Sequence, residues 1–467
     1  MKHLKYFTSI STIFFLLNCI LALPRTDPPT DPGHPFLFMW NVPSELCEVR
    51  FGVTLDLSHF HLISSTLKAA TNQPISIFYT DRYGIFPYID EDTGEMYDDG
   101  LPQLVDLKEH RDHAEDDIEY YIPVDNPGLA ILDFEEWRPQ WIRNWGSKNI
   151  YKEISIAKVK NKTASLTDDE AEARAKIVFE RAAKRYFLRS INLGKKMRPK
   201  RQWGYYLYPD CYNYDFNQDM VGYTGECPDI EKARNDNLLW LWNASTALYP
   251  SIYLEEVLQD SMQARMFVRH RMKEKIGLMR DNDPRSVFES CLLRNSFDLV
   301  NTIGEASALG AAGVVSWGDM NITDNEDSCF DARRHLEQVM NNYILNVSTA
   351  TQLCSEALWQ RRGRCVRKQW DSDVFLHLDH RRYRIERLWR GGPLVVRGGL
   401  SQDDVDYYDT WFDCMCYTEQ PCRAPLMLNT INEDSVTKGN SAGAQRMSVY
   451  VLLMVGLMWN SVSTLCV

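Results

Sequence analysis

Two acidic residues at the end of an apolar run are the residues of this sequence best suited to chemistry. Asp133 and Glu135 follow the run Gly128-Leu-Ala-Ile-Leu. Such a run predicts a strand, and side chains at positions i and i+2 of a strand share one face. In barrel enzymes the C-terminal ends of the strands carry the chemistry. We therefore expect both carboxylates to point into one cleft, although acids at strand ends also cap helices or pair with an arginine such as Arg138.

Paired carboxylates are typical of enzymes that cleave glycosidic bonds. One carboxylic acid protonates the leaving oxygen, and a second group stabilises positive charge at the sugar carbon. Two neighbouring acids hold one proton between them, which raises the pKa of one partner and keeps an acid available near neutral pH. Aromatic side chains that stack on sugar rings should accompany the pair. Residues 203–208 and 240–253 are rich in Trp and Tyr, and they supply either such a platform or core packing.

The elements that must position these residues alternate between short β-rich runs and longer helical patterns from Phe36 to about Trp317. One helix is signalled by a capping box, Thr167 with Glu170, and ends at Gly194 and Pro199. This order predicts a parallel βα barrel, with a doubly wound open sheet as the alternative. The strand candidates are Phe36 to Val42, Ile75 to Thr80, Gly128 to Phe134, Gln202 to Tyr208, Ser251 to Glu255 and Gly313 to Gly318.

Length and composition indicate one large domain with an appended module. The chain has 467 residues, 44% of them hydrophobic and 25% charged, which are ordinary globular proportions. The net charge of -12 argues against nucleic acid as a partner, and an anionic substrate would need a local basic groove. Closely spaced cysteines beyond Cys354 predict a small module with too few apolar residues for a core of its own, so that it depends on disulfides.

The N-terminal segment indicates the compartment. A basic start is followed by the apolar stretch Phe7 to Leu23, which predicts a signal peptide over residues 1–22, removed near Ala22; a membrane anchor is the alternative. The chain should therefore enter the secretory pathway and its oxidising lumen. Four Asn-x-Ser/Thr sequons fit that compartment and are candidate glycosylation sites: Asn161, Asn243, Asn321 and Asn346.

The C-terminal segment predicts attachment to the cell surface. The apolar run Val449 to Trp459 is too short to span a bilayer, which needs about 20 residues. Small residues from Asn440 precede it, as in a signal for a GPI anchor. We expect a linker over residues 426–440, anchor attachment near Asn440 and an anchor signal over residues 441–467. The alternatives are a tail helix and a simply secreted protein.

Several motifs in one order resemble the vertebrate hyaluronidases, glycoside hydrolase family 56. They are Ile-Leu-Asp133-Phe-Glu135-Glu-Trp137-Arg-Pro, Trp203-Gly-Tyr-Tyr206-Leu-Tyr-Pro-Asp-Cys211, Ala247-Leu-Tyr-Pro-Ser-Ile-Tyr253 and Gly310-Ala-Ala-Gly-Val-Val-Ser-Trp317-Gly. The resemblance runs from about Pro35 to Cys422. It looks closest to the lipid-anchored branch that includes the sperm-surface hyaluronidase and hyaluronidase-4.

This resemblance implies a fold and a reaction. The fold would be a distorted TIM-like α/β barrel of seven βα units over residues 35–350, followed by a disulfide-rich EGF-like module over residues 351–425. The reaction would be endo-hydrolysis of the β-1,4 bond after N-acetylglucosamine in hyaluronan, or after its equivalent in chondroitin, with retention of configuration. The acetamido oxygen of the substrate acts as nucleophile in that family, so no metal and no cofactor are expected. We expect a monomer.

The resemblance also implies roles for individual residues. Glu135 would act first as the acid and then as the base, while Asp133 would share its proton and orient the acetamido group. Tyr206 and Tyr253 would bind the same sugar by hydrogen bonds, and Trp317 would close the floor of the pocket. The implied disulfides are Cys47 with Cys329, Cys211 with Cys227, Cys354 with Cys365, and Cys416 with Cys422.

The sequence departs from the family pattern at two places. Trp359 stands where the family has a cysteine, so the expected partner of Cys414 is missing and the module is predicted to be loose. Cys291 is not part of the family pattern either. The stretch between His270 and Glu305 is shorter than in relatives and shows no clean strand, so the barrel would be one strand short unless Val287 to Leu293 substitutes. An open wall would favour a catalytically weak or inactive cell-surface hyaluronan-binding glycoprotein, or a decayed copy, over an active enzyme.

Overall fold

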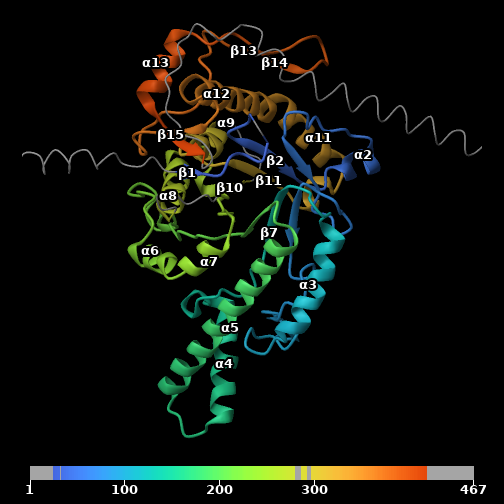
Figure 1. Cartoon of the computed structure of the whole chain (residues 1–467), viewed down its shortest axis with the longest axis vertical. Coiled ribbons are helices and arrows are strands. Elements are labelled where there is room, and N and C mark those ends of the chain that lie inside the picture. Colours follow the sequence, from blue (N-terminus) through green and yellow to red (C-terminus); the bar gives the residue numbers. More distant parts are fainter. Residues whose placement is uncertain (1–24, 32, 279–285, 292–295, 418–467) are drawn as a thin grey trace, which may run out of the picture.

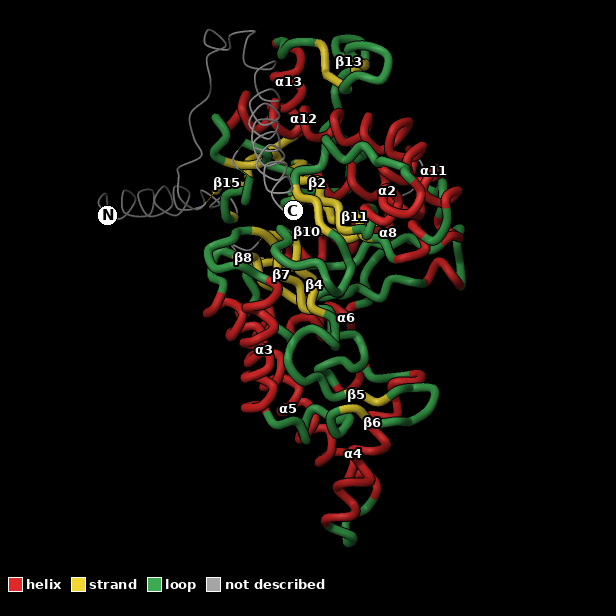
Figure 2. The backbone as a smooth tube through the Cα atoms, turned by 90° about the vertical axis from the view of Figure 1, so that its right-hand side faces the viewer, coloured by secondary structure: helices red, strands yellow, loops and turns green. Residues whose placement is uncertain are grey.

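The computed structural model describes residues 25–31, 33–278, 286–291 and 296–417. The expected signal peptide, linker, lipid-anchor signal and Cys422 lie outside these residues. Parallel strands occupy the middle of the molecule and helices surround them (Figure 1, Figure 2). The chain is thus an α/β protein, as the alternation of sequence patterns predicts.

The parallel strands form two sheets. One has the order β3-β2-β11-β10-β9 and the other the order β4-β7-β8. A parallel bridge between Tyr206 and Tyr249 joins β8 to β9, and the hydroxyl of Ser64, the last residue of β3, accepts the Ile75 N–H of β4 at 2.9 Å. The two sheets therefore meet at both of their edges. The strands are β2 (Leu37–Asn41), β3 (Leu62–Ser64), β4 (Ile75–Phe78), β7 (Gly128–Leu132), β8 (Arg201–Tyr205), β9 (Ala247–Leu248), β10 (Ser286–Cys291) and β11 (Gly313–Trp317).

Five of the six strands expected from the sequence are present near the expected positions, and one expectation is wrong. The strand expected at Ser251 to Glu255 lies earlier, at β9, where Ala247 and Leu248 pair with Ser286 and Val287 of β10. Pro250 follows directly, and proline cannot donate to a strand ladder. The β-rich residues beyond it therefore form a loop.

The expectation of a missing strand is also wrong. β10 lies between β9 and β11, and its residues Phe288–Cys291 pair in parallel with Gly313–Ser316 of β11. The segment that the sequence offered only as a possible substitute is thus a strand with a neighbour on each side. Backbone pairing from both sides outweighs a weak strand propensity, because that propensity depends mainly on context.

Helices cover the outside of the sheets. α5 begins at the capping box of Thr167 and Glu170, as predicted, but it runs on through Gly194 to Met197. A Cβ atom at Gly194 would lie 2.5 Å from the Trp203 ring, so this glycine permits close packing and does not end the helix. Within the described residues no helix is both long and apolar enough to cross a membrane. The helices are α2 (Glu45–Phe51), α3 (Leu107–Tyr121), α4 (Asn149–Lys162), α5 (Asp168–Met197), α6 (Asp229–Asp236), α7 (Leu239–Ala244), α8 (Met262–Leu278), α9 (Ser296–Leu299), α10 (Glu305–Ala308), α11 (Glu326–His335), α12 (Asn341–Trp359) and α13 (Gln402–Trp411).

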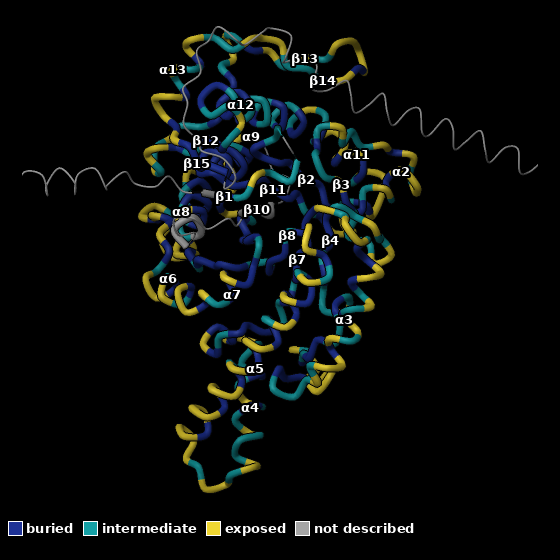
Figure 3. Tube along the Cα trace, in the orientation of Figure 1, coloured by how far each residue is buried: buried dark blue, intermediate teal, exposed yellow. Residues whose placement is uncertain are grey.

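The core is rich in aromatic side chains, and it lies between the strands and the helices (Figure 3). Trp203 of β8 stacks on Phe78 with ring centroids 5.8 Å apart, and Tyr205 stacks on Phe187 at 4.3 Å. Trp242 is buried as well. Most of the aromatic residues that the sequence offered as a sugar platform therefore form the core.

The C-terminal segment is joined to the rest of the chain by a helix and by charges. α12 runs continuously across the expected boundary between residues 350 and 351. Fully buried Glu305 of α10 accepts from Arg269 at 2.7 Å and from Arg367 of β12 at 3.2 Å. Breaking such a buried group of ions is strongly destabilising. The remaining strands are β1 (Arg25–Thr26), β5 (Tyr88–Ile89), β6 (Met96–Tyr97), β12 (Gly363–Arg367), β13 (Arg384–Arg387), β14 (Leu394–Arg397) and β15 (Phe412–Tyr417).

The expectation that this segment lacks a core and is loose is wrong. Leu376, Tyr408 and Phe412 are buried in a hydrophobic cluster that also includes residues of α12. Trp359, which replaces a family cysteine, packs against Cys414 and Cys416. An indole ring thus fills the space beside the two cysteines, and burial raises the pKa of the Cys414 thiol to about 12.

Disulfides join distant parts of the chain. Bonds link Cys47 with Cys329, Cys211 with Cys227, and Cys354 with Cys365, which are three of the four expected pairs. Cys416 is also disulfide-bonded, while its expected partner Cys422 lies outside the described residues. The side chain of Cys291, which stands outside the expected pairs, is likewise not described.

Candidate active site

The C-terminal ends of four parallel strands surround one pocket. Its volume is about 190 Å³. All five residues that the sequence singled out for chemistry line it, although they come from segments up to 184 positions apart, between Asp133 and Trp317. The lining residues are Ile77, Ile131, Asp133, Glu135, Tyr206, Tyr253, Val315 and Trp317.

Asp133 directly follows β7 and lines the pocket. Its Oδ1 atom is buried and has no hydrogen-bond partner among the described residues. Burial raises the pKa of Asp133 well above its usual value, the neighbouring charges of Glu135 and Glu136 raise it further, and Arg138 opposes the rise. The protonated, neutral form of Asp133 therefore persists to higher pH, and a buried oxygen remains for a ligand to contact.

Glu135 lies two residues further on, at the mouth of the pocket. Its side chain is 47% exposed, and its Oε2 atom lies 3.4 Å from Nη2 of Arg138. The Arg138 guanidinium also donates to the Glu135 carbonyl, and the Glu135 N–H donates to Oε2 of Glu136 at 3.1 Å. These contacts hold the backbone while the carboxylate stays accessible to solvent. The sequence offered pairing with Arg138 as an alternative to a catalytic role. The structure shows that Glu135 both contacts Arg138 and lines the pocket.

Two tyrosines line the pocket together with the carboxylates. Tyr206 follows β8, and burial together with the neighbouring Tyr253 raises its pKa well above the usual value, so it stays protonated and able to donate. Tyr253 lies in the loop beyond β9, where its ring meets the Trp317 ring edge to face at 6.4 Å. Tyrosine hydroxyls and an indole ring therefore line the same pocket as the two acids.

Tyr79 is the residue near the site that the sequence reasoning missed. It directly follows β4, and its hydroxyl accepts the Nε1–H of Trp317 at 3.1 Å. Burial raises the pKa of Tyr79 to about 12, while the bond from Trp317 opposes the rise. The signal was available, because Tyr79 belongs to the predicted strand Ile75 to Thr80 and occupies the same strand-end position as Asp133. Three apolar lining residues were also missed, because their position inside apolar strands indicates only core packing: Ile77, Ile131 and Val315.

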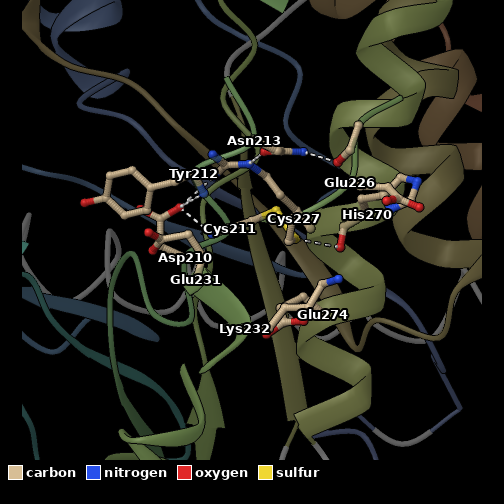
Figure 4. The surroundings of a disulfide bond; sticks show 12 residues. Asp210, Cys211, Tyr212, Asn213, Glu226, Cys227, Glu231, Lys232, His270 and Glu274 are labelled. Atoms are coloured by element: carbon tan, nitrogen blue, oxygen red, sulfur yellow. Dashed lines mark hydrogen bonds and ion pairs between the residues drawn. A yellow bond between two sulfur atoms is a disulfide. The ribbon is translucent and has the colours of Figure 1, made fainter. Parts of the chain in front are cut away.

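The loop beyond β8 is held in place beside the site by a disulfide (Figure 4). Next to the Cys211–Cys227 bond, Asn213 donates to the Gly225 carbonyl at 2.7 Å. The Arg271 Nε–H donates to Oδ1 of Asn213 at 2.9 Å. These contacts join the loop that follows Tyr206 to residues distant in sequence.

None of the four sequon asparagines lines the strand-end pocket. Asn161, Asn243 and Asn321 are exposed, whereas Asn346 is only partly exposed and its Oδ1 accepts the Leu378 N–H at 3.1 Å. The first three asparagines are thus open to modification, and the fourth already makes a contact within the protein. Glycosylation itself stays a prediction.

Comparison with known proteins identifies relatives over most of the chain. The sequence profile of the family described as "Hyaluronidase" matches residues 25–425. Human hyaluronidase PH-20 is 43% identical over 422 residues, which cover 88% of this chain and 82% of the relative. Mouse hyaluronidase-5 is 43% identical over 436 residues, which cover 91% of this chain and 82% of the relative.

A solved structure agrees with the sequence comparisons. Bee venom hyaluronidase in complex with a hyaluronic acid tetramer superposes with a TM-score of 0.57 at 26% identity, covering 66% of this chain and 98% of that one. The matched profile extends over more than half of the sequence and includes every residue of the pocket. The chain belongs to the hyaluronidase family.

Proposed function

We propose that the strand-end pocket hydrolyses hyaluronan by a retaining, substrate-assisted mechanism with Glu135 as acid and base. Membership of the family makes the chain a glycosidase that acts on hyaluronan. The observation that carries the residue assignment is the unpartnered, buried Oδ1 of Asp133 beside the accessible carboxylate of Glu135. Such an atom is costly unless a ligand satisfies it.

In the first step Glu135 gives its proton to the leaving oxygen as the glycosidic bond breaks. The acetamido oxygen of the same sugar attacks the anomeric carbon, so that a cyclic intermediate forms and no enzyme carboxylate bonds to the sugar. Asp133 faces the acetamido group and orients it by a hydrogen bond. Its burial keeps that side of the pocket free of bulk water, which strengthens the interaction.

In the second step water attacks the anomeric carbon and gives its proton to the Glu135 carboxylate. The acetamido ring opens, and the two inversions together retain the configuration. The half-exposed position of Glu135 supports this double role, because the same group must reach both a leaving sugar and a water molecule. Tyr206 and Tyr253 donate to the sugar, and Trp317 provides the apolar floor.

We further propose that the parallel strands form a distorted barrel of seven βα units and that the C-terminal segment is an EGF-like module. The edge contacts between the two sheets support the barrel. The alternative of an inactive binding protein rested on an open wall, and β10 occupies that position. An active enzyme is therefore the better supported function.

The test uses the purified ectodomain, incubated with hyaluronan and separately with chondroitin, followed by sizing of the products. Glu135→Gln should fold and be secreted normally but lose about 10²- to 10⁴-fold in kcat, because only the proton donor is removed. Glu119→Gln is the control, since Glu119 is exposed on α3 and does not line the pocket. Equal activity of wild type and Glu135→Gln would disprove the assignment.

For the location we propose passage through the secretory pathway, removal of the signal peptide near Ala22 and a lipid anchor near Asn440. Phosphatidylinositol-specific phospholipase should release the protein from intact cells. Asn440→Gln should abolish lipid attachment, and with it the effect of the phospholipase, unless a neighbouring residue accepts the lipid instead. Protein that stays on the membrane after effective treatment would indicate a tail helix. Protein found only in the medium would indicate simple secretion.

A further inference from the structure

A second and larger cavity of about 710 Å³ lies between α3 and α5, which run side by side on the outside of the sheets (Figure 1, Figure 2). No residue that lines it also lines the strand-end pocket. We name it the α3–α5 groove. Its charged lining residues are Lys108, Arg111, Glu115, Arg185, Arg189 and Lys196.

The groove is basic in a protein that is acidic as a whole. Five of its lining residues are Lys or Arg and one is Glu, while the chain carries a net charge of -12. Lys108 and Arg111 on the α3 side are partly neutralised, because both pair with Asp112. A concave basic surface concentrates anions more strongly than scattered exposed charges do.

The cations on the α5 side are exposed and carry no ion pair within the described part of the chain. Arg185, Arg189 and Lys196 have no carboxylate within salt-bridge distance there. Together with Asn192 they recur at spacings of four, three and four residues, which places them on one face of a helix. Like charges four residues apart destabilise a helix. Helix stability therefore does not explain this row, whereas an anionic ligand lying along it would.

The floor of the groove is apolar. Leu188 and Leu193 line it together with His110, which is 1% exposed. The His110 Nε2 atom lies 2.9 Å from the Ser190 hydroxyl, which ties α3 to α5. Sugar rings present apolar C–H faces between their charged and polar groups, so a row of cations above an apolar floor matches an anionic polysaccharide. A lipid surface would instead require a convex or flat patch with exposed large apolar side chains.

We propose that the α3–α5 groove binds an anionic polysaccharide chain at a second site, outside the strand-end pocket. The proposal rests on the proposed function only in taking the polymer to be hyaluronan. The groove would retain long chains between cleavage events, while short substrates would depend on the pocket alone. Binding along the groove is electrostatic at exposed side chains, so it should weaken as salt rises.

The test compares two charge-reversal variants of the ectodomain, each combined with Glu135→Gln so that the polymer stays intact. The groove variant carries Arg185→Glu, Arg189→Glu and Lys196→Glu. The control carries Arg174→Glu, Lys176→Glu and Arg181→Glu, which are exposed cations of the same helix that do not line the groove. Equilibrium binding of long hyaluronan is measured at low and at high salt, with phosphatidylserine vesicles as a second probe.

The groove variant should bind long hyaluronan about tenfold more weakly at low salt, as expected for the loss of three exposed charge contacts. Its salt dependence should flatten, and the control should match the parent. In the active background, cleavage of a hyaluronan hexasaccharide should be the same in the control and the wild type. The thermal midpoint shows whether charge reversal impairs folding. If it does, a neutral variant replaces the groove variant, with Arg185→Gln, Arg189→Gln and Lys196→Gln.

Three results would overturn the proposal. Unchanged polymer binding in the groove variant would show that the groove is not used, and equal losses in both variants would show a general effect of net charge. Lost vesicle binding with intact polymer binding would assign the groove to a membrane surface. Failure of Glu135→Gln to stop cleavage would instead contradict the proposed function, and polymer binding would then be compared at times too short for measurable cleavage.

Discussion

The indole Nε1–H of Trp317 donates a hydrogen bond to the hydroxyl of Tyr79 at 3.1 Å. Trp317 ends β11 in one sheet, and Tyr79 directly follows β4 in the other. The bond therefore crosses between the two sheets at the strand ends and holds the indole ring that lines the pocket. Tyr79 is a positioning residue for Trp317.

Removal of this bond should loosen the floor of the pocket. Tyr79→Phe keeps the ring but leaves the indole N–H without its acceptor, and we expect kcat/KM on hyaluronan to fall about two- to tenfold. Tyr120→Phe is the matched control, because Tyr120 is 59% exposed on α3. Steady-state kinetics on both variants, with thermal midpoints, is the measurement. A fall in the midpoint with unchanged kcat/KM would make Tyr79 merely structural.

The buried carboxyl of Asp133 should make stability depend on pH. Burial and the Glu135 charge raise the pKa of Asp133 above its value of 3.8 in the unfolded chain. The folded state thus binds the proton more tightly, so stability is highest below the unfolded pKa and is lost as pH rises through the folded pKa. Asp133→Asn cannot ionise, and its thermal midpoint should rise relative to wild type as pH increases.

Thermal unfolding from acidic to neutral pH measures this difference, with exposed Asp236→Asn as the control. The control should differ from wild type by the same amount at every pH. The thermal midpoint of Asp133→Asn relative to wild type could instead stay constant with pH, or fall toward neutral pH. Either result would show that ionisation of Asp133 does not destabilise the folded protein. Activity of Asp133→Asn should fall strongly, because the orienting carboxyl is lost.

Strand β10 should be essential for folding. Ser290 pairs with Val315 in the middle of the ladder with β11. Ser290→Pro removes a backbone N–H and restricts the backbone, so secreted protein should fall several-fold or more, whereas Ser290→Ala should be secreted like wild type. Secretion measured by immunoblot of the medium decides the matter. Normal yield and activity of the proline variant would show that β10 is dispensable.

Local patterns in the sequence were sufficient for features whose cause is local. The Asp-x-Glu at the end of an apolar run predicts two carboxylates on one face, because alternation along a strand does not depend on the rest of the chain. The start of α5 follows from the capping box of Thr167 and Glu170, which is a contact between residues three positions apart. The same reasoning, applied to β4, would have found Tyr79.

Other features depend on contacts between distant residues, and only the tertiary structure decided them. β10 is a strand because β9 and β11 pair with it, although its own residues have a weak pattern. Trp359 stabilises the C-terminal segment by filling space beside Cys414, where the sequence showed only a lost cysteine. The α3–α5 groove exists because Lys108 and Arg189, 81 positions apart, come to line one cavity. Periodicity along one segment cannot reveal which faces meet, since that is determined by the packing of the whole fold.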